Sequence, residues 1–380
     1  MISPLQGTST DRFAGLRSAF EANLESGEEL GASLVVNVDG KNVVDLWGGY
    51  QDADRTLPWT SDTIVNVWST TKTVTYLAAL MLADQGEIDL HSPVEKYWPE
   101  FGANGKSDIE VRHLLAHTSG VSGWEKPFTV EDMYDWEKST AALAAQAPWW
   151  KPGTAGGYHS QNQGHLIGEV IRRTTGLTFR QFVDAEIAGP LGADFQIGAR
   201  REDWDRVAEI VPPPPRRVDL AAVPADHPMV KTFTGPVADP TAANTEAWRR
   251  ADMGATNGHG NARSVARMLS AISLGGEVDG VRLLSQDTID QVFDVQATGP
   301  DLVLGVPIRR GMGFALADPE AMPTLPEGRI CYWGGWGGSV IIMDLDRRMT
   351  IAYMMNRMGP GVVGSGRSEQ YLREIYGAVG

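Results

Sequence analysis

A serine and a lysine three positions apart, Ser69 and Lys72, are the residues of this sequence best suited to covalent catalysis. They stand where an extended stretch, Ile64–Trp68, runs into a helix-forming segment, so both side chains point to the same side of the first helical turn. Burial near Val74 and Leu77 would lower the pKa of the lysine, and a neutral amine can take the serine proton. The spacing therefore predicts a nucleophilic serine with a lysine base. On the motif alone, an N-capping serine with a salt-bridged lysine is the competing interpretation.

Other catalytic templates find no support. There is no G-x-S-x-G nucleophile elbow, and Leu114 stands where a zinc-binding H-E-x-x-H motif would need glutamate between His113 and His117. The triplet Gly105–Ser107 matches the last three residues of a phosphate-binding loop, but Glu100 stands where the first glycine of that motif should be. The single cysteine, Cys331, lies in an apolar stretch that suits an inert core thiol. We therefore expect neither a metal site nor a cofactor.

The elements that must position these residues are strands from both ends of the chain and helices between them. Strands are predicted at Ala32–Val38, Asn42–Trp47, Arg329–Trp333, Ser339–Leu345 and Met349–Asn356. Helices are predicted at Asp11–Leu24, Thr73–Gln85, Asp108–Ala116, Glu131–Ala147, Gly164–Thr175, Thr178–Ala188, Asn261–Leu274 and Ser368–Gly377. This order predicts an α+β fold in which helices flank one antiparallel sheet, with an inserted helical domain.

The predicted domains follow from this order. Residues 1–90 and 255–380 would form the α/β domain with the sheet, and residues 91–254 the inserted, mainly helical domain. Within the insertion, residues 202–250 hold eight of the 22 prolines of the chain. Proline runs suit stiff, exposed, non-helical chain, so we expect a long ordered excursion against the helical domain. A plain linker is the alternative.

Several motifs taken together resemble the class C β-lactamase-like serine hydrolases, which have the penicillin-binding-protein fold. The matching segments are Ser69-x-x-Lys72, Arg112–Gly120, Tyr158 and Trp333–Gly338. The superfamily includes D-aminopeptidases and the family VIII carboxylesterases, and the motifs are closest to the latter. The resemblance covers about residues 31–356. In this superfamily the run that contains His117 and Ser119 is structural, so the resemblance gives these two residues no catalytic role.

The resemblance implies a catalytic role for Tyr158. This residue matches the family's tyrosine, whose phenolate-like oxygen exchanges a proton with the nucleophile Ser69. An ordinary tyrosine has a pKa of about 10, so Lys72 is expected to stabilise the anion. Ser160 stands where the Tyr-x-Asn motif of the family has the asparagine that contacts a substrate amide.

A second implied region is the glycine-rich strand near the C-terminus. Trp333, Gly334 and Gly335 replace the Lys-Thr-Gly triplet of the lactamases, and they are implied to bind substrate. The glycines let an acyl group approach the strand backbone. The backbone N–H groups of Ser69 and Trp336 are implied to form the oxyanion hole, which stabilises the charge of the tetrahedral intermediate.

Composition limits the partners. Asp and Glu (48) outnumber Lys and Arg (33), and the net charge of −15 repels phosphate backbones, so no nucleic acid is expected. No apolar run is long enough to span a membrane, and the first residues lack the pattern of a secretory signal. One cysteine excludes an internal disulfide framework. We expect a cytoplasmic monomer or homodimer whose partner is a small ester.

These observations together predict a serine carboxylesterase that hydrolyses small, neutral, short-acyl esters. Ser69 would carry the acyl group, and Lys72 and Tyr158 would carry the proton. The alternatives are a β-lactamase or a D-aminopeptidase-type amidohydrolase, an acyltransferase of the same fold, and a non-catalytic ligand-binding descendant. Because Trp333 stands where lactamases carry a cation, we expect weak or no hydrolysis of penicillins and cephalosporins.

Overall fold

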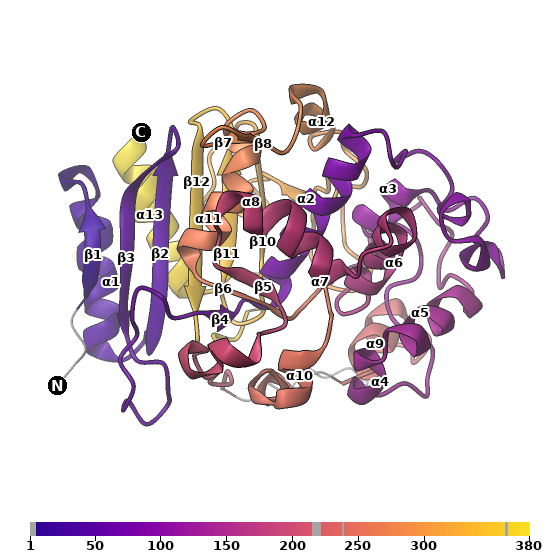
Figure 1. Ribbon diagram of the computed structural model, residues 1–380, viewed down its shortest axis with the longest axis horizontal. Helices are drawn as coiled ribbons and strands as arrows, with labels where there is room; N and C mark the ends of the chain where they lie inside the picture. Colours follow the sequence, from indigo (N-terminus) through magenta and orange to yellow (C-terminus); the bar gives the residue numbers. More distant parts are fainter. Residues whose placement is uncertain (1–4, 215–221, 238, 362–363) are drawn as a thin grey trace.

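The main sheet joins the two ends of the chain. The structure is a computed structural model that describes residues 5–214, 222–237, 239–361 and 364–380. Seven antiparallel strands follow the order β1-β3-β2-β12-β11-β10-β9 (Figure 1). They are β1 (Gln6–Ser9), β2 (Gly31–Val38), β3 (Lys41–Gly49), β9 (Ala315–Leu316), β10 (Ile330–Gly334), β11 (Val340–Asp344) and β12 (Met349–Met355). Because β2 pairs with β12, the predicted sheet of N- and C-terminal strands is confirmed.

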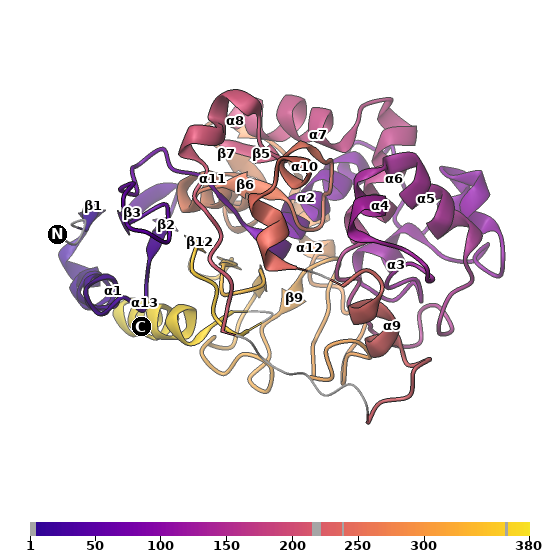
Figure 2. The same cartoon turned by 90° about the horizontal axis from the view of Figure 1, so that it is seen from below.

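Helices cover both faces of this sheet. The terminal helices α1 (Ala14–Ser26) and α13 (Gly366–Val379) pack side by side on one face, and α11 (Ala262–Ser273) packs on the other (Figure 2). Helix α2 (Thr71–Asp84) contacts both α11 and α6 (Gln163–Thr175). All residues of α2 from Thr71 to Leu82 are buried, as the sequence predicts for a central helix.

The remaining helices are short and lie mainly away from the sheet (Figure 1). They are α3 (Val111–Leu115), α4 (Val130–Tyr134), α5 (Trp136–Ala145), α7 (Phe179–Phe182), α8 (Gly189–Leu191), α9 (Pro228–Thr234), α10 (Glu246–Arg250) and α12 (Gln286–Gln291). The helix predicted over Glu131–Ala147 is two helices, because the carboxylate of Asp135 accepts the N–H of Lys138 and starts α5 anew. The helix predicted over Thr178–Ala188 continues from α7 as a π-helix, Val183–Ala188.

The proline-rich excursion contains short helical turns and extended chain. A 3₁₀ helix, Arg201–Arg206, begins it, and α9 and α10 follow. Residues 215–221 and 238, which include the last proline of the Pro212–Pro215 run, lie outside the described residues. The carbonyl of Pro236 accepts a hydrogen bond at 3.3 Å from Gln161, close in sequence to Tyr158. The excursion therefore contacts the segment that carries the candidate tyrosine.

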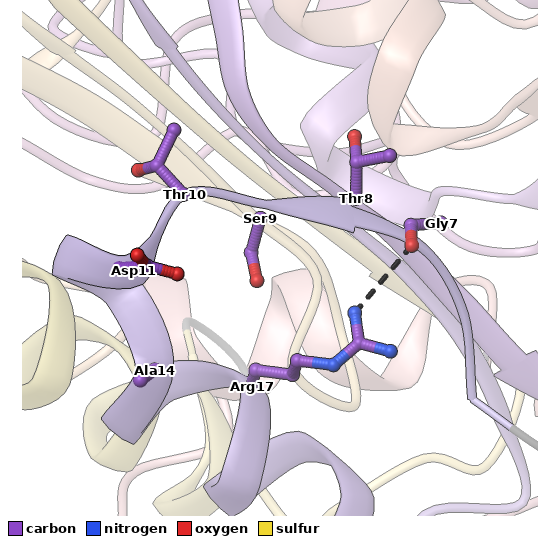
Figure 3. Close-up of a pocket in the computed structure, with 7 residues that line it drawn as sticks. All are labelled: Gly7, Thr8, Ser9, Thr10, Asp11, Ala14 and Arg17. Carbon is purple, nitrogen blue, oxygen red and sulfur yellow. Dashed lines mark hydrogen bonds between the residues drawn. The ribbon is translucent and has the colours of Figure 1, made fainter.

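Strand β1, at the edge of the sheet, does not follow from the sequence pattern. It is a short polar segment whose Gly7 has φ +93°, and a Cβ there would collide with the carbonyl of Asp45. Figure 3 shows Arg17 of α1 pointing to β1, where its guanidinium donates to the Gly7 carbonyl at 3.4 Å. The surface pocket around these residues has a volume of about 380 Å³ and also contains Asp11. A short edge strand with a nearby charge is a common protection against edge-to-edge association.

One hydrophobic core runs through both of the predicted domains. The same buried cluster contains Val35 and Ile341 of the sheet, Leu77 of α2, and Leu114 and Ile171 of the helical region. The division of the chain into residues 1–90 with 255–380 and residues 91–254 stays a prediction, and this shared cluster crosses its boundary.

A buried ion pair attaches the last helix to the sheet, and it carries a stability prediction. The carboxylate of Glu29 lies 2.8 Å from Arg367 of α13 and accepts hydrogen bonds at 2.6 Å from Tyr353 and at 3.1 Å from Tyr371. Glu29→Ala leaves a buried guanidinium without a counter-ion, which costs about 3–5 kcal/mol. We expect urea unfolding to show this loss in the free energy of unfolding.

The matched control is the neighbouring Glu28, whose side chain is exposed. Glu28→Ala should change the free energy of unfolding by no more than about 0.5 kcal/mol. Equal unfolding midpoints for Glu29→Ala and Glu28→Ala would show that the buried pair contributes nothing.

Candidate active site

Ser69 lies at a strained turn between a strand and the central helix. Strand β4 (Val65–Asn66) belongs to a small sheet with β6 (Gly258–Gly260) and β5 (Phe195–Ile197), and the N–H of Val67 donates to the carbonyl of Gly258 at 2.8 Å. Trp68 then takes φ +51°, a left-handed value that is unfavourable for a bulky residue. The turn brings Ser69 to the start of α2, where 7% of its surface is exposed.

Packing of aromatic rings holds this turn. The ring of Trp68 lies 5.2 Å from that of Trp336 and 5.4 Å from that of Trp248, both in edge-on contacts. The indole N–H of Trp248 in turn donates to the side chain of Asn66 at 3.0 Å. Because tertiary contacts surround Trp68 on both sides, they can stabilise a backbone conformation that the isolated residue would avoid.

Lys72 has the surroundings of a proton acceptor. Its Nζ lies 3.0 Å from Ser69 Oγ and donates to the carbonyls of Ser160 at 2.7 Å and Ala255 at 2.9 Å. A neutral amine has two N–H groups and one lone pair, so two carbonyl acceptors leave the lone pair for the serine hydroxyl. Burial lowers the pKa of Lys72 well below its usual value, and the charge of Arg310 lowers it further. Both effects favour the neutral amine.

Tyr158 lies on the other side of the same hydroxyl. Its Oη donates to Ser69 Oγ at 2.7 Å, and its ring centre is 4.9 Å from Lys72 Nζ. Burial raises the pKa of Tyr158 to about 12, although its hydrogen bonds with Ser69 and Trp333 and the positive charge of Arg310 oppose this change. This shift favours the neutral phenol, whereas the resemblance implies a phenolate-like oxygen. Burial disfavours the phenolate, and a Lys72 shifted toward its neutral form gives the anion less electrostatic support.

The backbone of Tyr158 is held by a loop that no motif marks. Its N–H donates to Asp301 Oδ1 at 2.9 Å, and the other carboxylate oxygen accepts from Arg310 at 2.6 Å. The N–H of Leu302 also donates to the carbonyl of Gly156 at 2.9 Å. Sequence reasoning missed both charged residues, since they lie more than a hundred positions from Tyr158 and form no recognisable pattern.

The glycine-rich turn after β10 packs directly against the serine turn. The Ser339 hydroxyl donates to the carbonyl of Val67 at 2.9 Å and lies 3.0 Å from the hydroxyl of Thr70. A Cβ on Gly335 would lie 2.5 Å from that same carbonyl, so only glycine permits the approach. In the part of the chain that the structure describes, the N–H of Trp336 donates to no acceptor. It is therefore available to a bound ligand.

The two other implied substrate contacts differ in accessibility. Ser160 is half-buried, and it touches Lys72 through its backbone carbonyl. Trp333, in β10 next to Gly334, is buried, and its ring centre lies 5.2 Å from that of Tyr158. Direct contact between these side chains and a substrate stays a prediction.

The histidines near the site are enclosed by protein. His117 Nε2 lies 3.0 Å from the hydroxyl of Tyr76, and its Nδ1 accepts the N–H of His159 at 2.9 Å. The imidazole of His159 lies 2.6 Å from the hydroxyl of Ser119, and burial lowers its pKa to about 3. Ser119 and His159 are fully buried. A serine–histidine pair without access to solvent suits the structural role that the resemblance gives this run.

Comparison with known proteins places the chain in a family. The family model described as beta-lactamase matches residues 16–373, so the chain belongs to the beta-lactamase family. Esterase/beta-lactamase LipL of Mycobacterium tuberculosis is 32% identical over 363 residues, which cover 93% of this chain and 83% of LipL. No helix among the described residues has the length and apolar character that crossing a membrane requires.

Solved structures agree with this assignment. The crystal structure of a family VIII carboxylesterase superposes with a TM-score of 0.92 at 37% identity, and the match covers 98% of this chain and 99% of the other. A penicillin-binding protein homologue from Caulobacter crescentus gives a TM-score of 0.89 at 34% identity, with the same coverage. The predicted fold class is therefore confirmed.

Proposed function

We propose that this protein is a serine carboxylesterase that forms an acyl-enzyme on Ser69. The observation that carries the proposal is the convergence of Lys72 Nζ at 3.0 Å and Tyr158 Oη at 2.7 Å on the hydroxyl of one serine, Ser69. The similarity to a family VIII carboxylesterase and to an esterase/beta-lactamase supports the same reaction class.

In the proposed acylation, Ser69 Oγ attacks the ester carbonyl carbon while its proton moves to the lone pair of Lys72. The carbonyl electron pair moves onto oxygen, and the N–H groups of Ser69 and Trp336 stabilise the resulting negative charge. When the bond to the leaving alcohol breaks, Tyr158 gives that oxygen its proton. The proton held by Lys72 then replaces the one that Tyr158 has lost, so both groups return to their resting state.

In the proposed deacylation, water takes the place of the alcohol. Lys72 accepts a proton from the water, whose oxygen bonds to the acyl carbon and forms a second tetrahedral intermediate. The bond to Ser69 Oγ then breaks, and Oγ takes the proton back from Lys72. The carboxylic acid leaves, and the resting arrangement of Ser69, Lys72 and Tyr158 is restored.

The substrate class that we propose is small neutral esters with short acyl chains. Trp333 stands where a lactamase carries a lysine, so the side chain that would pair with a substrate carboxylate is replaced by a neutral indole. The net charge of −15 also disfavours anionic substrates at long range, to a degree that salt reduces.

The direct test is covalent labelling. A serine-directed fluorophosphonate should add to Ser69, and mass spectrometry of the digested protein should locate it there. With p-nitrophenyl butyrate, stopped-flow absorbance should show a burst of p-nitrophenol equal to the enzyme concentration if deacylation is the slow step. Label on Ser119 or Ser339 would contradict the assignment.

A comparison of substrates tests the proposed preference. A hydrogen bond to a charged group is worth about 1.5–3 kcal/mol. Loss of the lactamase cation should therefore lower the affinity or rate for a β-lactam by about 10-fold to 100-fold. We expect kcat/KM for p-nitrophenyl butyrate to exceed that for the β-lactam nitrocefin by about 100-fold. Nitrocefin turnover equal to or faster than ester turnover would make the protein a β-lactamase.

A further inference from the structure

Two buried charged residues beside the site, Asp301 and Arg310, take no part in the proton transfers above. We propose that Arg310, held in place by Asp301, is a positioning residue that keeps Lys72 uncharged and so sets the lower pH limit of catalysis. This inference rests on the proposed function of Lys72 as the base.

The geometry places two potential cations around one aromatic ring. Lys72 Nζ lies 4.9 Å from the centre of the Tyr158 ring, and the guanidinium carbon of Arg310 lies 6.0 Å from the same centre. The two groups are therefore within about 11 Å of each other. Arg310 also lies 5.2 Å from the ring of Trp333, and only 1% of its side chain is exposed. Water can do little to screen a charge so enclosed.

Asp301 has more hydrogen-bond partners than Arg310, to which it is paired. The Asp301 carboxylate accepts a hydrogen bond from the Arg310 guanidinium at 2.6 Å. It also accepts hydrogen bonds at 2.9 Å from the backbone N–H groups of Tyr158, Val303 and Leu304. The guanidinium donates only to Asp301, and its Nε and Nη1 have no partner among the described residues. Several donors thus stabilise the Asp301 carboxylate. The Arg310 guanidinium has one hydrogen-bond partner among the described residues and otherwise lies beside the rings of Tyr158 and Trp333.

Lys72 has no compensating anion. Its partners are one hydroxyl and two carbonyls, and no carboxylate forms an ion pair with it among the described residues. Arg310 is the charge that acts on it most after burial itself. An ammonium at Lys72 would therefore be a second buried cation close to the first, which favours the neutral amine.

The other titratable groups facing this pair do not change charge near neutral pH. They are Tyr76, His117, Tyr158, His159, Asp301 and Tyr332. Burial raises the pKa of each tyrosine, to about 12 for Tyr158 and Tyr332, and lowers that of both histidines. Arg310 lowers the pKa of the Asp301 carboxyl against the effect of burial, so this group is ionised. Lys72 is therefore the group whose titration the acidic limb should report.

The experiment is the pH profile of kcat/KM for p-nitrophenyl butyrate in charge variants of the pair. Removing the cation in Arg310→Gln should move the acidic limb to higher pH by about one unit, the size of a single-charge effect at 11 Å and an effective dielectric constant of about 20. Asp301→Asn leaves the arginine charge unopposed and should move the limb to lower pH. Arg310→Lys keeps the charge and should leave the limb within about 0.3 units of wild type.

Two further variants separate this effect from misfolding. Asp301→Asn/Arg310→Gln leaves no unpaired buried charge, and its limb should lie above that of wild type and below that of Arg310→Gln. The matched control is Arg367→Gln, which breaks the buried ion pair with Glu29 on α13 and should lower stability without moving the limb. Unchanged limbs in folded Arg310→Gln and in the double variant would overturn the proposal.

A direct titration keeps this test independent of the proposed function. NMR of protein labelled with ¹³C at lysine Cε reports the protonation of Lys72 whether or not an ester turns over, and the signal is assigned by its absence in Lys72→Arg. The Lys72 signal should titrate about one pH unit higher in Arg310→Gln than in wild type. The same titration midpoint in both proteins would refute the role of Arg310, whereas absent ester turnover would refute the esterase.

Discussion

Ser69→Ala should reduce kcat for p-nitrophenyl butyrate by about 10⁴–10⁶-fold, the range expected when a covalent nucleophile is removed. No other hydroxyl among the described residues lies within hydrogen-bond distance of both Lys72 Nζ and Tyr158 Oη. The variant keeps the N–H groups proposed for the oxyanion hole, so weak residual turnover by water is expected. Steady-state kinetics and loss of fluorophosphonate labelling measure the effect.

Ser119→Ala is the matched control for this variant. Its hydroxyl is also buried and also lies within hydrogen-bond distance of a basic group, at 2.6 Å from His159 Nε2. Removing it leaves an unpaired buried imidazole nitrogen, which costs about 1–3 kcal/mol of stability. The variant should therefore unfold more easily while Ser69 is still labelled. Full activity in Ser69→Ala would refute the proposed acyl-enzyme.

The part of the site that the sequence predicts best is the part that is local in the chain. Ser69 and Lys72 lie on one helical turn, so their spacing alone places the amine beside the hydroxyl, and the structure finds them 3.0 Å apart. Tyr158 is 89 positions from Ser69 in the chain, and only the resemblance of several motifs joined it to the pair. Its Oη is nevertheless 2.7 Å from Ser69 Oγ.

Features that depend on tertiary packing were not predictable from the pattern. The left-handed backbone of Trp68 is held by contacts with Trp248 and Trp336, which are distant in sequence. Asp301 and Arg310 reach Tyr158 from a loop whose sequence contains no motif. Protonation of the tyrosine likewise depends on its complete burial, which a linear motif does not report.

In the fold, too, the features that are local in the chain are predicted better than those that depend on tertiary packing. Apolar runs and helical spacing predict the central strands and helices well. Strands β10, β11 and β12 read as continuous apolar runs because they are buried at every position, with helices on both faces of the sheet. Strand β1 is polar and glycine-containing, and its place in the sheet comes from its antiparallel pairing with β3, which a linear pattern does not show. The break between α4 and α5 is decided by the cap at Asp135, a local hydrogen bond that competes with the continuing helical pattern.

Lys72→Met and Tyr158→Phe should each lower kcat for p-nitrophenyl butyrate by about 10²–10⁴-fold, the usual contribution of general acid–base catalysis. Both groups contact the same oxygen, Ser69 Oγ, and in the proposed acylation the proton that Lys72 takes from Ser69 replaces the one that Tyr158 gives to the leaving alcohol. The double variant should therefore lose little more activity than the worse single variant, because residues that act as one unit are not additive.

Matched controls exist for both substitutions. Lys106 is also a buried lysine, and its Nζ donates to the carbonyls of Ala103 at 2.8 Å and Ala144 at 3.0 Å, but to no serine. Tyr353 is also a buried tyrosine, and it donates to Glu29. Lys106→Met and Tyr353→Phe should lower stability and leave kcat within a few-fold of wild type.

The pH dependence of kcat/KM tests the same roles of Lys72 and Tyr158. The base is the neutral amine of Lys72, whose pKa is lowered by burial and by Arg310, so kcat/KM should rise with pH through that lowered pKa and then level off. The plateau should extend toward pH 12, because the phenol of Tyr158 keeps its proton up to a pKa of about 12. In Lys72→Met the acidic limb should disappear, since no group remains whose deprotonation produces the base. If the limb persisted unchanged in Lys72→Met, or Tyr158→Phe kept most of its kcat, the proton would travel by another route.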